Sequence, residues 1–252
     1  MMYSANLGFL WTDRALPDAI RSARAAGFAA VECHWPYDTP ASGVKAALEE
    51  TGLSMLGLNT VRGKAGESGL SALPGREAEA RAAIDQAIDY AVSIDAKAIH
   101  VMAGFSEGQT AEATFLENLA YARKQCPDDI TLLIEPLNRH DAPGYFLKTT
   151  GQAADLIGQL NLPGVKIMFD CYHVGRTEGD IVTRFLALMP VIGHVQFASV
   201  PDRSAPDQGE VNFDFVFRRI AAAGWSRPLG AEYKPGGDTD ATLGWMQTFS
   251  AG

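Results

Sequence analysis

Four apolar stretches of the chain each end in a side chain whose oxygen could bind a metal ion. They are Leu132-Leu133-Ile134-Glu135, Ile167-Met168-Phe169-Asp170, His194-Val195-Gln196 and Leu229-Gly230-Ala231-Glu232. A single residue of this kind is best explained as a helix cap or an ion-pair partner. Three carboxylates and an amide at the same position of four successive strands would be strongly unfavourable without a counter-charge. Because all four ligate through oxygen, we expect a hard cation, Mg²⁺ or Mn²⁺, rather than zinc.

Two of these residues, Glu135 and Glu232, are long enough to hold a metal with one oxygen and reach a substrate with the other. On opposite sides of a bound sugar-like molecule, they would act as a base and an acid. The metal would polarise a carbonyl group and stabilise an enediolate. The sequence therefore predicts proton transfer next to a carbonyl, with both glutamates as catalytic residues.

Further candidates could contact a substrate. His173 lies just past the end of a strand, where it could donate to a substrate oxygen or serve only as a cap. His100 lies inside a strand and fits a core position better than the mouth of a site, and His194 is interpreted as structural. Arg203 and Lys234 are cations near the ends of the last two strands. Either could bind a substrate carboxylate, although exposed cations usually only face solvent.

These residues need a scaffold that gathers strand ends. Most of the apolar runs that we interpret as strands are continuously apolar, as parallel strands covered on both faces are. They are Tyr3–Phe9, Ala30–Trp35, Leu53–Thr60, Ala96–Ala103, Ile130–Leu137, Val165–Tyr172, Ile192–Ala198 and Leu229–Lys234. Amphipathic stretches between them predict helices, most clearly over Glu77–Ile94 and over Thr110–Gln125 with Thr110 as its N-cap. Gly27, Gly52, Gly164 and Gly224 are expected to end helices in left-handed backbone.

The strict alternation of strands and helices predicts an α/β fold, a (β/α)8 TIM barrel forming a single domain over residues 1–252. An open doubly wound sheet is the alternative, but the first turn, Asn6-Leu7-Gly8-Phe9, lacks its glycine-rich motif. In a barrel, the carboxyl ends of the strands meet at the mouth, where the four metal-binding candidates would gather. The longest irregular stretch, Val61–Gly75, is a candidate lid.

Composition excludes several classes of protein. The net charge is −9, from 21 basic and 30 acidic residues, and no basic cluster is present, so nucleic acid is not an expected partner. No apolar run reaches ~18 residues, which excludes a transmembrane helix. The N-terminus lacks the basic region of a signal peptide. The three cysteines are far apart, so disulfides are not expected. We therefore expect a cytoplasmic location.

Longer strings of residues carry a family resemblance over nearly the whole chain. They include Ser4-Ala5-Asn6-Leu7, Trp35-Pro36-Tyr37-Asp38, Leu73-Pro74-Gly75-Arg76-Glu77, Ile134-Glu135-Pro136-Leu137-Asn138, Asp141-Ala142-Pro143-Gly144-Tyr145-Phe146-Leu147, Phe169-Asp170-Cys171-Tyr172-His173, Gly193-His194-Val195-Gln196, Gly209-Glu210-Val211-Asn212-Phe213 and Gly230-Ala231-Glu232-Tyr233-Lys234-Pro235. On these strings the chain resembles the hydroxypyruvate isomerase family, within the xylose isomerase-like TIM barrels.

The resemblance implies the same site as the strand ends do. Members of that family bind Mg²⁺ or Mn²⁺ at positions matching Glu135, Asp170, Gln196 and Glu232, and the two glutamates are taken as proton donor and acceptor. The implied reaction interconverts hydroxypyruvate and 2-hydroxy-3-oxopropanoate. Close relatives isomerise 2-oxo-tetronates, and more distant ones epimerise ketoses. The expected partner is therefore a small 2-oxo acid or a short sugar, and a homo-oligomer is open because such barrels often pair.

One pocket loop departs from the family pattern. After the third strand the family usually carries a Gly-Asp-Trp stretch, whereas this chain reads Asn59-Thr60-Val61-Arg62-Gly63-Lys64-Ala65-Gly66-Glu67. Arg62 and Lys64 add positive charge that suits an acidic substrate, although surface charges need no such explanation. An epimerase or dehydratase acting on a ketose is the next alternative. An apurinic-site endonuclease would require a histidine-rich zinc site and a basic groove, and a non-catalytic barrel would not require all four strand-end residues.

Overall fold

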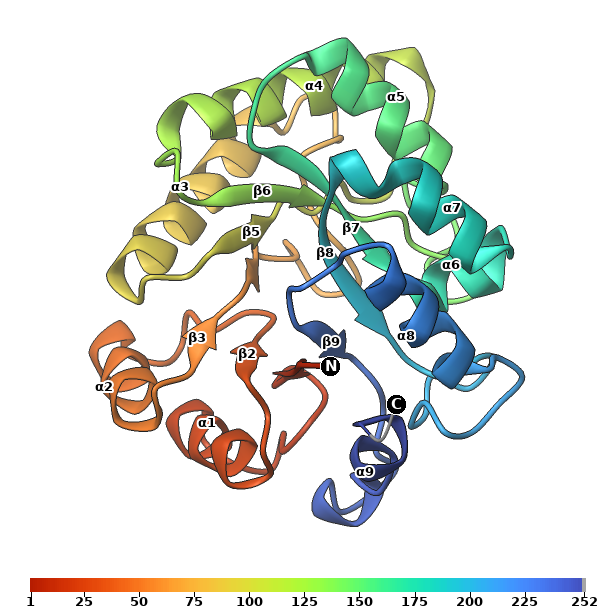
Figure 1. Ribbon diagram of the computed structural model, residues 1–252. Helices are drawn as coiled ribbons and strands as arrows, with labels where there is room; N and C mark the ends of the chain where they lie inside the picture. Colours follow the sequence, from red (N-terminus) through yellow and green to blue (C-terminus); the bar gives the residue numbers. More distant parts are fainter. Residues whose placement is uncertain (251–252) are drawn as a thin grey trace.

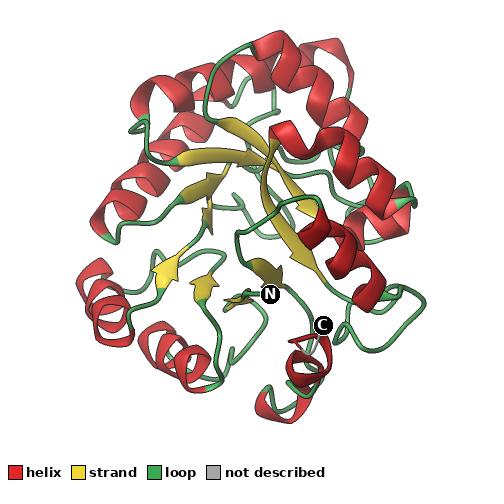
Figure 2. Ribbon diagram, viewed as in Figure 1, coloured by secondary structure: helices red, strands yellow, loops and turns green. Residues whose placement is uncertain are grey.

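The structure is a computed structural model that describes residues 1–250. Within these residues, parallel strands form a closed central barrel, and helices lie around its outside (Figures 1 and 2). The strands are β1 (Tyr3–Asn6), β2 (Ala30–Glu32), β3 (Ser54–Met55), β4 (Leu58–Asn59), β5 (Ala98–His100), β6 (Thr131–Ile134), β7 (Val165–Asp170), β8 (Ile192–Phe197) and β9 (Leu229–Ala231). They pair in the order β3-β2-β1-β9-β8-β7-β6-β5-β4. The predicted TIM barrel is confirmed.

The stretch expected to be the third strand is divided into β3 and β4. β3 pairs with β2, whereas β4 pairs with β5, the next strand along the chain. The two residues between them still bond to the β2 side, because the Leu56 N–H donates to the Val31 carbonyl at 2.7 Å and the Cys33 N–H donates to the Gly57 carbonyl at 3.0 Å. β3 and β4 are thus two halves of one barrel strand, and together they close the barrel.

The outer layer follows the predicted rhythm with local differences. The helices are α1 (Leu16–Ala25), α2 (Ala41–Thr51), α3 (Glu77–Ser93), α4 (Gly108–Gln125), α5 (Thr150–Leu160), α6 (Cys171–Thr177), α7 (Ile181–Leu188), α8 (Phe213–Ala222) and α9 (Trp245–Ser250), with short 3-10 turns η1 (Met189–Val191) and η2 (Asp240–Thr242). Thr110 does not cap α4, because the chain enters this helix two residues earlier through Gly108 at φ +84°.

Three of the four predicted glycine stops are confirmed. Gly27, Gly52 and Gly224 follow α1, α2 and α8 with φ of +92°, +67° and +90°. The fourth expectation is displaced, because Asn161 takes the left-handed position after α5 and Gly164 turns the chain into β7 three residues later. Asn is the other residue that adopts this backbone readily, which is why the glycine pattern misplaced the end of α5.

The core lies between the barrel and its helices. An aromatic cluster joins the first and last parts of the chain: Trp245 of α9 packs on Tyr3 of β1 and Phe197 of β8, with ring centroids 4.9 and 5.4 Å apart. The cysteines Cys33, Cys126 and Cys171 are free and buried, as inert thiols are. Contacts between sequence-distant aromatic residues therefore hold the last helix against the barrel.

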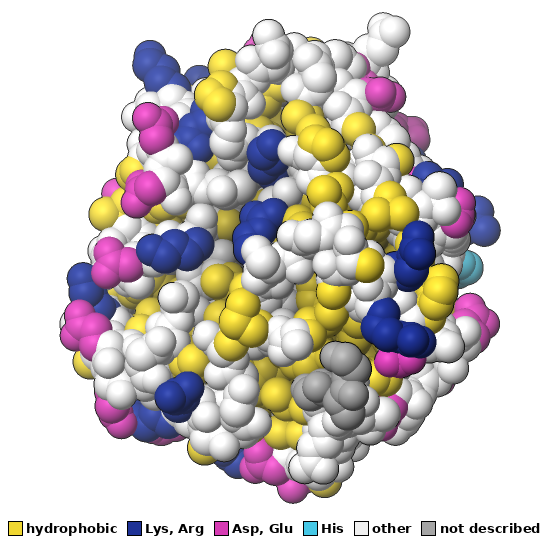
Figure 3. Space-filling view, viewed as in Figure 1, with side chains coloured by type: hydrophobic (Ala, Val, Ile, Leu, Met, Phe, Trp, Pro, Cys, Tyr) yellow, Lys and Arg dark blue, Asp and Glu magenta, His cyan; other side chains and the backbone are white. Residues whose placement is uncertain are grey.

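The outer surface carries mixed charge. Figure 3 shows separate basic and acidic side chains on the face in view, with apolar and polar surface between them. No helix in residues 1–250 is long and apolar enough to cross a membrane.

Candidate active site

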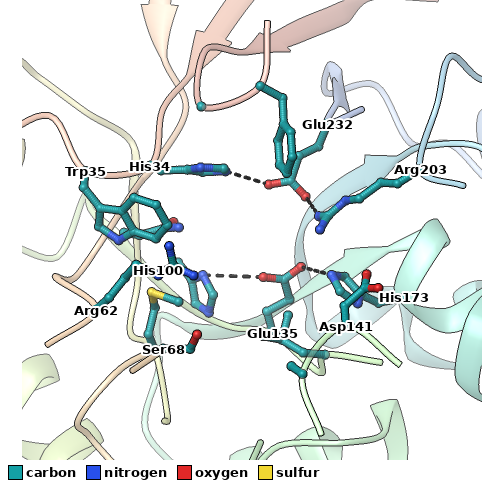
Figure 4. Close-up of a pocket in the computed structure, with 16 residues that line it drawn as sticks. His34, Trp35, Arg62, Ser68, His100, Glu135, Asp141, His173, Arg203 and Glu232 are labelled. Atoms are coloured by element: carbon teal, nitrogen blue, oxygen red, sulfur yellow. Dashed lines mark hydrogen bonds and ion pairs between the residues drawn. The ribbon is translucent and has the colours of Figure 1, made fainter. Parts of the chain in front are cut away.

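A cavity of ≈ 340 Å³ opens at the mouth of the barrel, where the strand-end residues converge. Glu135 and Glu232 face each other across it, as Figure 4 shows. Arg203 and His173 lie toward one side, and Trp35 and Arg62 lie toward the other (Figure 4). A volume of this size is typical of a small-molecule site.

Glu232 is held by three partners. Its Oε1 accepts hydrogen bonds from Asn6 Nδ2 and from His34 Nε2, each at 2.9 Å, and its Oε2 forms an ion pair with Arg203. Burial acts to raise the pKa of Glu232, but the Arg203 guanidinium and the His34 hydrogen bond outweigh it and lower the pKa to about 2. Glu232 is therefore ionised and fixed in position.

Glu135 follows β6 and has the opposite character. Its Oε1 is buried without a hydrogen-bond partner among the described residues. The nearest histidine ring nitrogens stand further off, with His100 Nδ1 3.5 Å from Oε2 and His173 Nε2 3.8 Å from Oε1. Burial raises the pKa of Glu135 well above its usual range, and repulsion from Glu232 and Asp170 adds to the effect. The two glutamates that face each other thus differ in their affinity for a proton.

Asp170 ends β7 and also caps the helix that follows. Its Oδ1 accepts the Tyr172 N–H at 2.8 Å, which fixes the carboxylate at the start of α6. Its Oδ2 has no hydrogen-bond partner within the described chain and lies 3.5 Å from Arg203 Nη2. Burial raises the pKa of Asp170 to about 7, although Arg203 works against this shift. One oxygen is thus used by the fold and the other remains free.

Gln196 lies beside Asp170, because the two are register partners across β7 and β8. Its Oε1 is buried without a hydrogen-bond partner in residues 1–250. The expectation of one shared register for all four residues is wrong, since Gln196 pairs with Gly230, two residues before Glu232. Barrel strands are tilted and staggered, so residues that meet at the mouth do not occupy the same step of the ladder.

The free oxygens fit a divalent cation. Glu135 Oε1, Asp170 Oδ2 and Gln196 Oε1 are all buried and all lack hydrogen-bond partners in the part of the chain that the structure describes. Buried polar atoms are seldom left without a partner, so three such oxygens from neighbouring strand ends are suited to bind a positive group. Carboxylate and amide oxygens are what Mg²⁺ and Mn²⁺ prefer.

His173 also lies in this group, since its ring nitrogen and oxygens of Glu135 and Asp170 fall within 4.8 Å of one another. Its Nδ1 accepts the backbone N–H of Asn138 at 2.9 Å, and burial lowers the pKa of His173 to about 3. A neutral ring whose Nδ1 accepts must carry its proton on Nε2. That Nε2–H faces the cavity as a donor, so His173 is suited to bind a substrate oxygen rather than a metal.

The other substrate-binding candidates have different positions. Arg203 lies in the cavity wall, between the rings of Phe9 and Tyr172 at 4.7 and 4.9 Å from its guanidinium carbon. His100 also lines the cavity, and burial lowers its pKa to about 3. Lys234 is exposed and does not line the cavity. The structure therefore brings together three of the four candidates.

Several residues of the site were missed by the sequence reasoning. They are Asn6, Glu32, His34 and Asp141. Glu32 and His34 alternate within Ala30–Trp35, so both point to one side of the strand, and this polar alternation in an apolar run was the available signal.

The loop over residues 61–75 forms a wall of the cavity. The Ala72 N–H donates to the Ala103 carbonyl at 2.7 Å, which ties the loop to the end of β5. Arg62 lines the cavity and stacks over the Trp35 ring at 4.6 Å. No acidic side chain in residues 1–250 forms an ion pair with Arg62, unlike Arg203. Arg62 is therefore a cation available to an anionic ligand.

Comparisons with known proteins agree with this architecture. The family model described as xylose isomerase-like TIM barrel matches residues 20–249. A 2-oxo-tetronate isomerase of Cupriavidus necator is 39% identical over 98% of each chain, and the hydroxypyruvate isomerase of Escherichia coli is 37% identical over 99% of each. A crystal structure from Brucella melitensis, described as an AP endonuclease of family 2, superposes with a TM-score of 0.94 at 36% identity over 98% of each chain.

Proposed function

The chain belongs to the xylose isomerase-like TIM barrel family, and on this premise we propose that it is a metal-dependent isomerase of short 2-oxo acids. The reaction assigned to it interconverts hydroxypyruvate and 2-hydroxy-3-oxopropanoate. Its relatives named hydroxypyruvate isomerase and 2-oxo-tetronate isomerase support an isomerase of the aldose–ketose type.

One observation carries the proposal: Glu135 and Glu232 face each other across the cavity (Figure 4), and Glu135 has an oxygen without a hydrogen-bond partner in residues 1–250, whereas three partners hold Glu232. Isomerisation of hydroxypyruvate moves one hydrogen from C3 to C2 and one from the C3 oxygen to the C2 oxygen. Glu232 takes the proton from C3, Glu135 delivers a proton to C2, and the proton of the C3 hydroxyl passes to the C2 oxygen. Exchange with solvent then removes the proton from Glu232 and restores the one on Glu135. In the reverse direction the two glutamates exchange roles, and no redox partner is needed.

The metal would be Mg²⁺ or Mn²⁺, held by Glu135, Asp170, Gln196 and Glu232. When bound, it supplies electron withdrawal from the substrate carbonyl, which makes the neighbouring C–H bond more acidic. The buried, partnerless oxygens of three of these residues support this assignment. Glu232 already makes three contacts, with Asn6, His34 and Arg203, which fix its position at the cavity.

The remaining wall residues orient the substrate. His173 donates its Nε2–H to a substrate oxygen on the Arg203 side of the cavity. Arg62, stacked on Trp35 at the opposite side, binds the substrate carboxylate. This placement favours 2-oxo acids over neutral sugars, because only an acid offers an anion to Arg62.

The proposal is tested by measuring hydroxypyruvate turnover with chelator-treated protein, before and after Mg²⁺ or Mn²⁺ is added. A coupled reductase reports the aldehyde product. We expect turnover only with metal, and loss of turnover in Glu135→Gln and Glu232→Gln variants that keep the circular dichroism spectrum of the parent. Normal turnover in both variants would refute the mechanism.

A four-carbon substrate is the second candidate, supported by the 2-oxo-tetronate isomerase relative and by a cavity of ≈ 340 Å³, which leaves room beyond three carbons. Metal binding without hydroxypyruvate turnover would direct the assay to 2-oxo-tetronates and then to ketoses. An apurinic-site endonuclease is disfavoured, although the Brucella melitensis structure carries that description. The free oxygens suit Mg²⁺ rather than a cluster of zinc ions, and the net charge of −9 opposes DNA binding.

A further inference from the structure

A fourth carboxylate, Glu32, lies in the barrel beside Gln196. It ends β2, is only 4% exposed and does not line the main cavity. Its Oε1 accepts from Ser4 Oγ at 3.0 Å, and its Oε2 accepts from His194 Nε2 at 3.0 Å and from Gln196 Nε2 at 2.8 Å. Both oxygens of Glu32 are therefore used within the protein, so it is not itself a free ligand.

These contacts decide which way the Gln196 amide points. An amide has a donor end and an acceptor end, whereas an ionised carboxylate only accepts. Glu32 therefore holds the Gln196 Nε2 toward itself and turns the Oε1 away. That Oε1 is buried and has no other partner in the described chain. A rotation of the amide by half a turn would bring two acceptors together and is unfavourable.

We propose that Glu32 is a positioning residue that fixes the Gln196 amide with its Oε1 facing the divalent cation. The inference rests on the proposed function, because it requires the cation at Glu135, Asp170 and Glu232. Groups that orient metal ligands commonly alter metal affinity by about 10–100-fold when they are removed. Glu32 would act in this way through Gln196 without touching metal or substrate.

The packing around Glu32 is built for this contact. Gly230 of β9 is the register partner of Gln196. A Cβ at Gly230 would lie 2.2 Å from Glu32 Oε1 and 2.9 Å from Gln196 Cγ, so a larger residue would displace both side chains. Burial of a carboxylate is unfavourable, and an apolar side chain could fill the same space. The buried carboxylate of Glu32 is therefore not needed to fill space, which is consistent with a role in orienting Gln196.

The direct test is Mn²⁺ binding to metal-free protein, measured by calorimetry and by loss of the free Mn²⁺ electron paramagnetic resonance signal. In Glu32→Gln the new amide can donate or accept, so the Gln196 amide is no longer forced into one orientation. We expect Mn²⁺ affinity to fall about 10–100-fold. Ser4→Ala is the matched control, because it removes a hydrogen bond to the other oxygen of Glu32. Its affinity should change less than about threefold.

An exchange variant separates orientation from general stability. Glu32→Gln combined with Gln196→Glu keeps one carboxylate and one amide, and the new amide can donate to the new carboxylate. Its Mn²⁺ affinity should return to within about threefold of the parent or become tighter. A purely structural role for Glu32 predicts no recovery. The exchange variant also decides the matter if Glu32→Gln does not fold by circular dichroism.

A crystal structure of the parent protein with Mn²⁺ adds a test that needs no variant. We expect Gln196 Oε1 on the metal and Nε2 on Glu32. If the parent does not bind Mn²⁺ at all, the proposed function fails. If the parent binds Mn²⁺ but Glu32→Gln binds it equally well, or the bound metal lacks Gln196, the role of Glu32 is overturned while the proposed function stands.

Discussion

Replacing Asp170 with Asn should make the metal-free protein more stable at neutral pH, although Asp170 is a proposed metal ligand. The carboxylate is 1% exposed, and its Oδ2 has no hydrogen-bond partner among residues 1–250. Asn keeps the shape and the Oδ1 that caps α6 through the Tyr172 N–H. The substitution therefore removes the buried charge while leaving the local structure in place.

The magnitude follows from the pKa of Asp170, which burial raises from 3.8 to about 7. Each pKa unit corresponds to about 1.4 kcal/mol, so ionised Asp170 weakens the fold by up to about 4 kcal/mol. The folded protein holds the proton between about pH 4 and pH 7, where the unfolded chain has lost it. The parent therefore loses stability as the pH rises from about 4 to about 7. Above about pH 7, the difference in unfolding free energy between the parent and Asp170→Asn reaches its full value.

The comparison with Asn removes the Asp170 charge and, with it, the repulsion that Asp170 exerts on Glu135, and both changes act in the same direction. Burial lowers the pKa of His100 and His173 to about 3, so these residues add stability as the pH rises toward about 6.5, and that opposes Asp170 in the parent protein. Both histidines are present in parent and variant, so their effect cancels in the difference. Glu232, with its pKa lowered from 4.5 to about 2, adds stability that is fully present above about pH 4.5, and this contribution also cancels in the difference.

The assay is chemical denaturation followed by circular dichroism with a chelator, at steps from about pH 4 to pH 8, for parent and Asp170→Asn. We expect equal stability near pH 4 and a variant more stable by a few kcal/mol near pH 8. Excess Mn²⁺ should stabilise the parent and reverse the order. A difference that stays flat with pH, or a variant less stable near pH 8 without metal, would show that burial does not raise the pKa of Asp170.

Other substitutions have expected outcomes that follow from particular contacts. Arg62→Gln should raise the KM for hydroxypyruvate about tenfold or more with little change in kcat, because a charged hydrogen bond contributes about 1.5–3 kcal/mol; steady-state kinetics checks this, and an unchanged KM contradicts it. Gly8→Ala places a Cβ 2.1 Å from His34 Nδ1, so it should displace the His34 bond to Glu232 and lower kcat more than tenfold, with the melting temperature as control. Gly230→Ala should weaken Mn²⁺ binding about tenfold by calorimetry; unchanged affinity would mean that Glu32 tolerates displacement.

Much of the fold could be predicted because its signals are local. Apolar runs marked the strands, and α3 ends one residue from its expected end. The division into β3 and β4 could not be predicted, because Leu56 and Gly57 are as apolar or as small as their neighbours. The division follows from tertiary pairing, since β3 pairs with β2 and β4 pairs with β5.

The proposed metal ligands could be predicted from the sequence, but the residues that hold these ligands in place could not. Strand-end position alone indicated Glu135, Asp170, Gln196 and Glu232, and the structure brings the two glutamates face to face. Strand-end position could not indicate that Arg203 would pair with Glu232, because Arg203 lies on a loop with a left-handed backbone, φ +57°, and most long cations of the chain are exposed. Partners joined by loops are set by tertiary geometry, which sequence periodicity does not encode.

The balance of charge in the described site connects these observations. Glu32, Glu135, Asp170 and Glu232 are all buried, and Arg203 forms ion pairs with Asp170 and Glu232. The carboxylates with raised pKa, Glu135 and Asp170, are also those with a partnerless oxygen, whereas the oxygens of Glu232 and Glu32 are occupied. Protons and a divalent cation therefore compete for the same oxygen atoms. This competition explains why Asp170→Asn should stabilise the metal-free fold and also weaken the stabilisation that Mn²⁺ gives the parent.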